Sequence, residues 1–272
     1  MRRDNGLPDI AWIKVPEFGP QGQREFLYHD GTRNTQHPGL PTFWMAKYPI
    51  TYAQFQAFVD ASDGYRNKEW CKGLADYFGK DSTLKQERWP IANRPRKNVT
   101  WPEAVAFCRW LTAQAAEHSE LLPAGETLAR LGKGWSIRLP TEQEWVKAAR
   151  GWDNRMYPWG EQAYQVGCAN VDETKEKVGP NNLQQTSAVG MYPHGASPFG
   201  VEEMSGNVWE YCLNKYEKPA DLDLGGSDWR AVRGGSWYTD AKGSSVAARN
   251  GGLGDGLNDF DLGFRVVCAA SP

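Results

Sequence analysis

Apolar residues recur at helical spacing in three segments, and each segment follows a threonine that can cap a helix. One helix is expected after Thr51, a second after Thr100 and a third after Thr141. Thr100 and Thr141 are each followed three residues later by a glutamate, which is the capping-box arrangement. The third helix is expected to end at Gly151. The pattern therefore predicts three helices, all within the first 151 residues.

Short runs rich in apolar, β-branched and aromatic residues predict strands. Turn-forming Gly and Pro dipeptides separate the later runs, and residues 62–98 are irregular. No internal repeat or linker divides the chain, so we expect one loop-rich α+β domain over residues 1–272. The runs cover residues 10–15, 24–28, 43–48, 137–140, 188–191, 208–213, 229–232 and 264–267.

The composition favours a compact domain and excludes several classes of function. With 13 Trp, 29 Gly and 17 Pro, large aromatic side chains can hold irregular segments in place. A net charge of −2 without a Lys/Arg block argues against nucleic acid or a membrane as the partner. No apolar run approaches the roughly 20 residues of a spanning helix, and the first residues lack a signal-peptide pattern. We expect a cytoplasmic monomer, with display at the cell surface left open.

The cysteines and histidines do not have the spacing of metal or disulfide sites. Five cysteines without a C-x-x-C pair argue against a disulfide framework and a thiolate zinc site. We expect most of them, including Cys268, to be buried small apolar residues. The histidines lie far apart in the sequence and show no ligand motif: His29, His37, His118 and His194.

The C-terminal tail combines a firm frame with an irregular insert. Arg233–Trp237 reads RGGSW and Gly263–Val267 reads GFRVV, which indicates tight backbone followed by a strand. Between them, residues 238–262 are small and polar and have no consistent period. Binding and catalytic loops are usually built in this way on a rigid scaffold.

A series of motifs resembles the formylglycine-generating enzyme (sulfatase-modifying factor) family. The resemblance covers the chain from about residue 40 to the end and implies a C-type-lectin-like fold of this family's type, α+β with little regular secondary structure. The motifs occur in the family's order: FWMAKYPITY at 43–52, NVTWPEAVAFC at 98–108, RLPTEQEWVKAARG at 138–151, YPWG at 157–160, EMSGNVWE at 203–210, RGGSW at 233–237 and GFR at 263–265.

Residues required by the known chemistries of this family are not found in the chain. The resemblance implies a copper-binding, redox-active cysteine pair between RGGS and GFR, but this interval has no cysteine. The iron-dependent sulfoxide synthases of the family use three histidines, and the chain has no H-x-x-x-E-x-H pattern. We therefore expect a protein that is not an enzyme and requires no cofactor. The alternative is a metal-dependent oxidoreductase of the formylglycine-generating or sulfoxide-synthase type, with a displaced metal site.

The tail most resembles the variable proteins of diversity-generating retroelements, with residues 233–267 as the variable region. In these proteins, adenine-directed mutagenesis rewrites the C-terminal part of a lectin-like domain and cannot produce Lys, Glu, Gln, Met or Trp. The insert from Tyr238 to Leu262 contains only Lys242 from that set. An ordinary loop rich in Gly, Ser and Asp is the alternative.

The leading hypothesis is a non-enzymatic binding protein that presents a diversified surface to an unknown protein or other macromolecule. Two aromatic side chains would be its anchors and small polar residues its adaptable contacts, a division typical of antibody paratopes. Trp237 is expected to border the surface. The surface residues would be Tyr238, Thr239, Asp240, Gly243, Ser245, Asn250, Gly252, Leu253, Asp259 and Phe260.

Two loops resemble structural calcium sites of the family, whose ligands are carboxylate, amide and carbonyl oxygens. The second is weaker because Asn181 stands where a carboxylate is usual. Hydrogen bonds alone could also hold both loops. The first set is Glu203, Gly206, Val208 and Glu210, and the second is Asn170, Val171, Asn181 and Leu183.

The charged residues of the tail allow other interpretations. Asp255, Asp259 and Asp261 could serve acid–base chemistry, but on a glycine-rich loop we expect them to be solvated or to contact a ligand. The arginines are expected to hold loop carbonyls or buried carboxylates: Arg233, Arg249 and Arg265.

Overall fold

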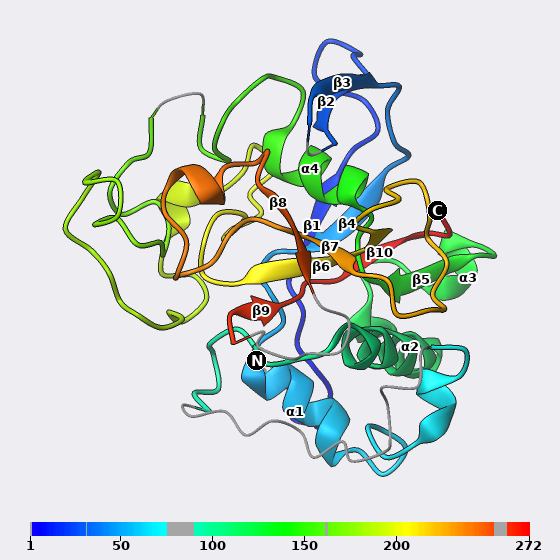
Figure 1. Ribbon diagram of the computed structural model, residues 1–272. Helices are drawn as coiled ribbons and strands as arrows, with labels where there is room; N and C mark the ends of the chain where they lie inside the picture. Colours follow the sequence, from blue (N-terminus) through cyan, green and yellow to red (C-terminus); the bar gives the residue numbers. More distant parts are fainter. Residues whose placement is uncertain (1, 31, 75–89, 161–162, 253–259) are drawn as a thin grey trace.

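A computed structural model of the chain is shown in Figure 1, and it describes residues 2–30, 32–74, 90–160, 163–252 and 260–272. In these residues, two four-stranded sheets and a hairpin of β2 (Phe26–His29) and β3 (Asn34–His37) are connected by helices and long loops. No helix within these ranges is long and apolar enough to cross a membrane.

The first sheet brings the beginning and the end of the chain together. Its strands lie in the order β1 (Trp12–Val15), β4 (Phe43–Ala46), β10 (Val267–Ala270) and β5 (Trp135–Arg138). Every neighbouring pair is antiparallel. The last strand, β10, therefore lies between β4 and β5.

The second sheet carries the C-terminal tail. Its order is β8 (Arg249–Gly252), β7 (Arg230–Arg233), β6 (Trp209–Lys215) and β9 (Leu262–Gly263). β6 pairs antiparallel with β7 and parallel with β9, while β8 pairs with β7. The strands β8 and β9 thus form opposite edges of the sheet.

The three predicted helices are confirmed. They are α1 (Tyr52–Asp60), α2 (Trp101–Glu117) and α4 (Glu142–Arg150), and each is preceded by the expected threonine in a complete capping box. The short α3 (Leu128–Leu131) was not predicted because four residues are too few to show a helical period. Four 3₁₀ turns in the described residues were not predicted for the same reason. They are Lys68–Cys71, Ser119–Leu121, Pro193–Gly195 and Lys242–Ser244.

Two hydrophobic clusters hold the sheets and helices together. On one side, Phe55 of α1 stacks on Phe107 of α2, and both rings meet Phe264 of the tail edge-on. Trp110 of α2 packs against Phe107 in a tilted arrangement. On the other side, Trp145 of α4 packs in a cluster with residues of β1, β2 and β4. In Figure 1, α1 and α2 lie below the sheets and α4 lies above them beside the β2–β3 hairpin.

Some strand predictions differ from the structure. Residues 188–191 form a turn, in which the Val189 N–H donates to the Asn93 carbonyl at 2.8 Å, although their apolar run predicts a strand. β3 has the polar sequence NTQH, which no hydrophobic pattern reveals. The prediction of buried cysteines is confirmed for Cys108, Cys168, Cys212 and Cys268, and all five are free thiols.

Lys147 of α4 makes the stability of this fold depend on pH. Its side chain is fully buried and its Nζ donates to the carbonyls of Leu40 and Glu17 at 3.2 and 3.4 Å. Burial lowers the pKa of Lys147 to about 8. The unfolded chain therefore binds this proton more tightly than the folded chain does. The free energy of unfolding should consequently rise as the pH increases from about 8 towards the ordinary lysine value.

We expect Lys147→Met to remove this rise, which amounts to up to about 3 kcal/mol for the shift of this one group. Urea unfolding at about pH 7 and about pH 10 measures the effect. Lys133→Met, at an exposed lysine between α3 and β5, is the control and should keep the wild-type difference. An unchanged difference in Lys147→Met would contradict the prediction.

Candidate functional site

The chain leaves β7 through a turn that only glycine can form. Gly234 and Gly235 have φ of +93° and +74°. A Cβ on Gly235 would lie 2.3 Å from the Ser244 Oγ and 2.7 Å from the Thr239 Oγ1. The two glycines therefore allow residues 236–244 to fold back tightly on the end of the strand.

Three aromatic rings cluster where this turn meets the chain before β9. The ring centroids of Trp237, Tyr238 and Phe260 lie 5.6 to 5.7 Å apart in tilted and edge-to-face arrangements. Tyr238 is 54% exposed and Phe260 43% exposed. We call these three residues the aromatic face. Large apolar side chains exposed together are typical of an interaction site.

A partly buried polar pair, Ser236 and Asp261, supports the aromatic face. The Ser236 hydroxyl is fully buried, donates to the Asp261 Oδ2 at 2.6 Å and accepts from the Tyr238 N–H at 3.1 Å. Burial raises the pKa of Asp261, and the bond from Ser236 partly offsets this. Asp261, one of three aspartates that could serve acid–base chemistry, thus lies next to Phe260 and can hold a proton more readily than an exposed aspartate.

Most of the other predicted surface residues near Tyr238 maintain the loop itself. Thr239 Oγ1 lies 2.7 Å from Ser244 Oγ and accepts from the Ser236 N–H. Asp240 accepts from the Gly243 N–H at 2.7 Å, and the Ser245 N–H donates to the Lys242 carbonyl. The side chains of Thr239 and Asp240 are partly exposed, but their hydrogen bonds already stabilise the turn, as does the backbone bond of Ser245.

The remaining predicted surface residues are not gathered with Tyr238 and Phe260. Asn250 is exposed on β8, at the sheet edge opposite β9, and Gly252 on the same strand is buried. A Cβ on Gly252 would meet Tyr211 and Val232 at 2.8 Å. Leu253, Asp255 and Asp259 lie outside the described residues.

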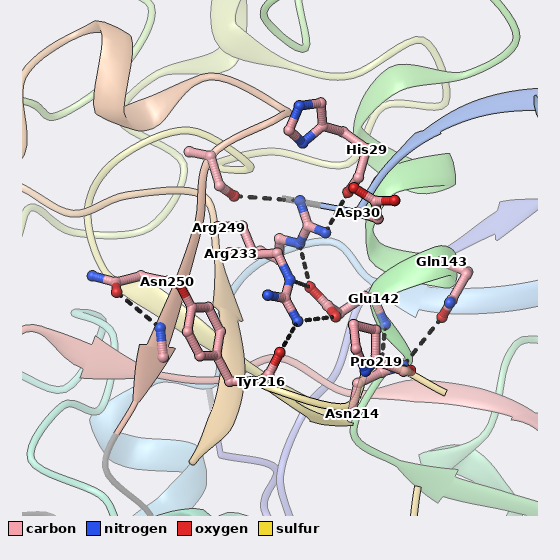
Figure 2. Close-up of polar contacts among 12 residues, drawn as sticks. His29, Asp30, Glu142, Gln143, Asn214, Tyr216, Pro219, Arg233, Arg249 and Asn250 are labelled. Atoms are coloured by element: carbon pink, nitrogen blue, oxygen red, sulfur yellow. Dashed lines mark hydrogen bonds and ion pairs between the residues drawn. The ribbon is translucent and has the colours of Figure 1, made fainter. Parts of the chain in front are cut away.

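The role predicted for the tail arginines, holding buried carboxylates and carbonyls, is confirmed. Figure 2 shows Arg233 and Arg249 converging on Glu142 of α4. Their Nε atoms each donate to Glu142 Oε1 at 2.8 Å, and the Arg233 Nη2 also donates to the His29 carbonyl at 2.7 Å. Arg265 forms a similar buried pair with both oxygens of Glu210, each at 2.6 Å.

In the first predicted calcium set, Glu210 is already paired with an arginine, which would compete with a calcium ion for its carboxylate. Glu210 already binds Arg265 and accepts from the Trp145 indole at 2.7 Å, so its carboxylate is neutralised. Glu203 is fully enclosed and accepts from the Gly190 N–H and the Asn207 amide, and burial raises its pKa to about 7. The side chains of this set therefore have protein partners. Calcium coordinated by them, with the carbonyls of Gly206 and Val208, stays a prediction.

The second calcium loop contains a carboxylate that the sequence pattern did not single out. Glu173 is fully buried and accepts from the Tyr164 hydroxyl and the Asn181 N–H, both at 2.9 Å. The Asn170 amide donates to the Gln185 carbonyl at 3.0 Å. Among the described residues, no ion pair joins Glu173 to a basic side chain, and a buried carboxylate of this kind would suit a cation. Calcium near Asn170, Val171, Asn181 and Leu183 also stays a prediction.

The described residues do not form a transition-metal site. No group of three or more His, Cys, Asp or Glu side chains in these ranges could hold a metal ion. His29 lies near Arg233 and Arg150, and burial followed by these charges lowers its pKa. The donors within the described part of the chain therefore do not fit a copper or iron centre.

The mixture of helices, two antiparallel-rich sheets and long loops agrees with the C-type-lectin-like fold expected from the sequence. Residues 14–270 match the family described as Sulfatase-modifying factor enzyme 1-like domain, and the chain belongs to this family. The predicted family and fold class are thus confirmed.

Relatives and solved structures agree with this assignment. The chain is 30% identical over 243 residues to the hercynine oxygenase of Mycolicibacterium thermoresistibile, covering 76% of this chain and 47% of that protein. It is 33% identical over 187 residues to the inactive C-alpha-formylglycine-generating enzyme 2 of Mus musculus, covering 65% and 49%. Treponema denticola variable protein 1 has the same fold, with a TM-score of 0.60, 20% identity and 95% of each chain covered.

The prediction that the chain is not an enzyme is wrong for its family. Relatives are named as hercynine oxygenases and formylglycine-generating enzymes, although some are named as inactive. The prediction relied on cysteines and histidines that this sequence lacks. The chain spans about half the length of the hercynine oxygenases it matches.

Glu142 is expected to be the side chain on which this region's stability depends most. In Glu142→Gln, the guanidinium groups of Arg233 and Arg249 stay buried without their carboxylate, which should cost about 3 to 5 kcal/mol of unfolding free energy. Asp60→Asn breaks the exposed pair with Arg2, whose side chains are 41% and 44% exposed, and should cost no more than about 1 kcal/mol. Denaturant unfolding compares the two, and equal losses would argue against this role for Glu142.

Proposed function

We propose that this chain is the substrate-binding part of a metal-dependent oxidoreductase of the hercynine-oxygenase or formylglycine-generating type, and that substrate binds at the aromatic face. The observation that carries the proposal is the 30% identity to a hercynine oxygenase over 76% of the chain. The exposed rings of Tyr238 and Phe260 support the choice of this surface.

The residues of the face have separate roles in this proposal. Trp237, Tyr238 and Phe260 bind the apolar or cationic part of the substrate, because ring faces attract both. Asp261, whose pKa is raised, forms a hydrogen bond with a polar group of the substrate or transfers a proton to or from it. Ser236 fixes the orientation of the Asp261 carboxylate. A metal centre would require ligands beyond the described residues.

Oxygen uptake by the full chain tests the proposal. We expect the chain supplied with copper or iron to consume oxygen with hercynine or with a cysteine-containing peptide, the metal being held by ligands beyond the described residues. Trp237→Ala should lower kcat/KM about 10- to 100-fold, because it removes a central aromatic anchor. Trp229→Ala changes an exposed tryptophan in the segment between β6 and β7 and should leave kcat/KM near the wild-type value. No oxygen uptake by the metal-loaded protein with either substrate would refute the proposal.

A second candidate function uses the same face as a diversified binding surface for a macromolecule. The specific observation that favours it is the residue content of positions 238–262, where Lys242 alone falls outside the set that adenine-directed mutagenesis can reach. The flanking DNA tests this candidate. We expect a near-copy of the segment encoding residues 238–262, with adenines at the varied positions, and a gene for a reverse transcriptase nearby. A locus without the repeat would remove this candidate.

A further inference from the structure

An ammonium group of the chain itself covers the Tyr238 ring. The Nζ of Lys175 lies 4.1 Å from the ring centroid, and it also donates a hydrogen bond to the Tyr238 carbonyl. The Oδ2 of Asp172 lies 3.9 Å from the Lys175 Nζ. The Lys175 side chain is 40% exposed, so this ammonium group is held at the surface of the protein.

These three partners together recognise one kind of cation. The ring face attracts any positive charge, and the buried Asp172 carboxylate adds a second attraction. The Tyr238 carbonyl, however, accepts a hydrogen bond, which a quaternary ammonium cannot donate. The arrangement therefore fits a primary ammonium group better than a methylated one.

The position of these partners does not depend on Lys175. The Asp172 N–H donates to the Thr239 carbonyl at 2.8 Å, and the Lys242 N–H donates to the Glu176 Oε2 at 3.2 Å. Asp172 also accepts from the backbone and hydroxyl of Thr174. The segment around Asp172 and the segment around Tyr238 thus remain attached when the lysine side chain is removed.

We infer that the Tyr238 ring, the Tyr238 carbonyl and the Asp172 carboxylate form a primary-ammonium subsite, and that Lys175 is its internal occupant. A ligand with an alkylammonium group, such as a lysine side chain, binds by displacing Lys175. Because a ligand must displace Lys175, only a ligand that makes the same contacts with the ring, the carbonyl and the carboxylate binds well. The inference depends on the proposed function in one respect, namely that the aromatic face is the surface to which ligand binds.

Titration of the full chain with n-propylammonium tests the inference, with indole and phenol fluorescence or NMR shifts of the aromatic face as the readout. Lys175→Ala should bind n-propylammonium at least about fivefold more tightly than wild type, because the competing ammonium is gone. In the same variant, tetramethylammonium and propan-1-ol should bind more weakly, since one lacks an N–H donor and the other lacks a charge. Equal affinity for all three compounds would overturn the assignment to a primary ammonium.

Two further variants complete the test. Lys177→Asn removes a charge from the same loop, keeps a residue that tolerates the positive φ of 57° at this position, and should bind like wild type. Tyr238→Leu combined with Lys175→Ala keeps the carbonyl but loses the ring, and should lose the gain in affinity. If Lys175→Ala binds n-propylammonium no better than wild type, or if the double variant keeps the gain, the subsite is refuted.

The outcomes separate this inference from the proposed function. Full oxygen turnover by Trp237→Ala would remove the proposed role of the aromatic face, whatever the titration shows. Loss of turnover in Trp237→Ala, together with unchanged n-propylammonium affinity in Lys175→Ala, would refute the primary-ammonium subsite and leave the proposed function standing.

Discussion

The rest of the site depends on the ion pairs that Glu142 makes with Arg233 and Arg249. Arg233 is the last residue of β7 and Arg249 the first residue of β8, so both ends of the segment 234–248 are attached to one carboxylate. Glu142 begins α4, where the helix dipole also favours a negative charge. The irregular segment that carries Trp237 and Tyr238 is thereby held at its base while its tip remains exposed.

Two guanidinium groups share this single carboxylate in the protein interior, and backbone carbonyls complete their coordination. Arg249 donates to the Tyr216 carbonyl at 2.7 Å and stacks its guanidinium 4.5 Å from the Tyr216 ring. Buried charges of this kind contribute little net stability compared with apolar packing, but an unpaired one is costly. The arrangement therefore disfavours any other path of the chain between β7 and β8. The Glu210–Arg265 pair has the same effect where the tail returns to the core.

Local signals were sufficient for the helices and for the framework, but not for the ligand face. Each capping threonine and its partner lie three residues apart, so their hydrogen bonds are readable in sequence. The strands β3, β8 and β9 have polar or glycine-rich sequences and exist because neighbouring strands offer them hydrogen bonds. The loop between Thr239 and Ser245 was expected to be a contact surface, whereas many of its polar groups bond to one another. Lys175 was missed because 63 residues separate it from the ring it covers.

The sequence alone determined the family, the α+β class, the three main helices and the arginines that frame the tail, because those features are encoded in motifs and short-range spacing. Only the tertiary structure decided which side chains meet. It put Phe260 against Trp237 and Tyr238, Ser236 against Asp261 and Lys175 over Tyr238, and it separated Asn250 from all of them. These contacts join residues that are distant along the chain. Their geometry follows from strand order and buried ion pairs, which no local pattern contains.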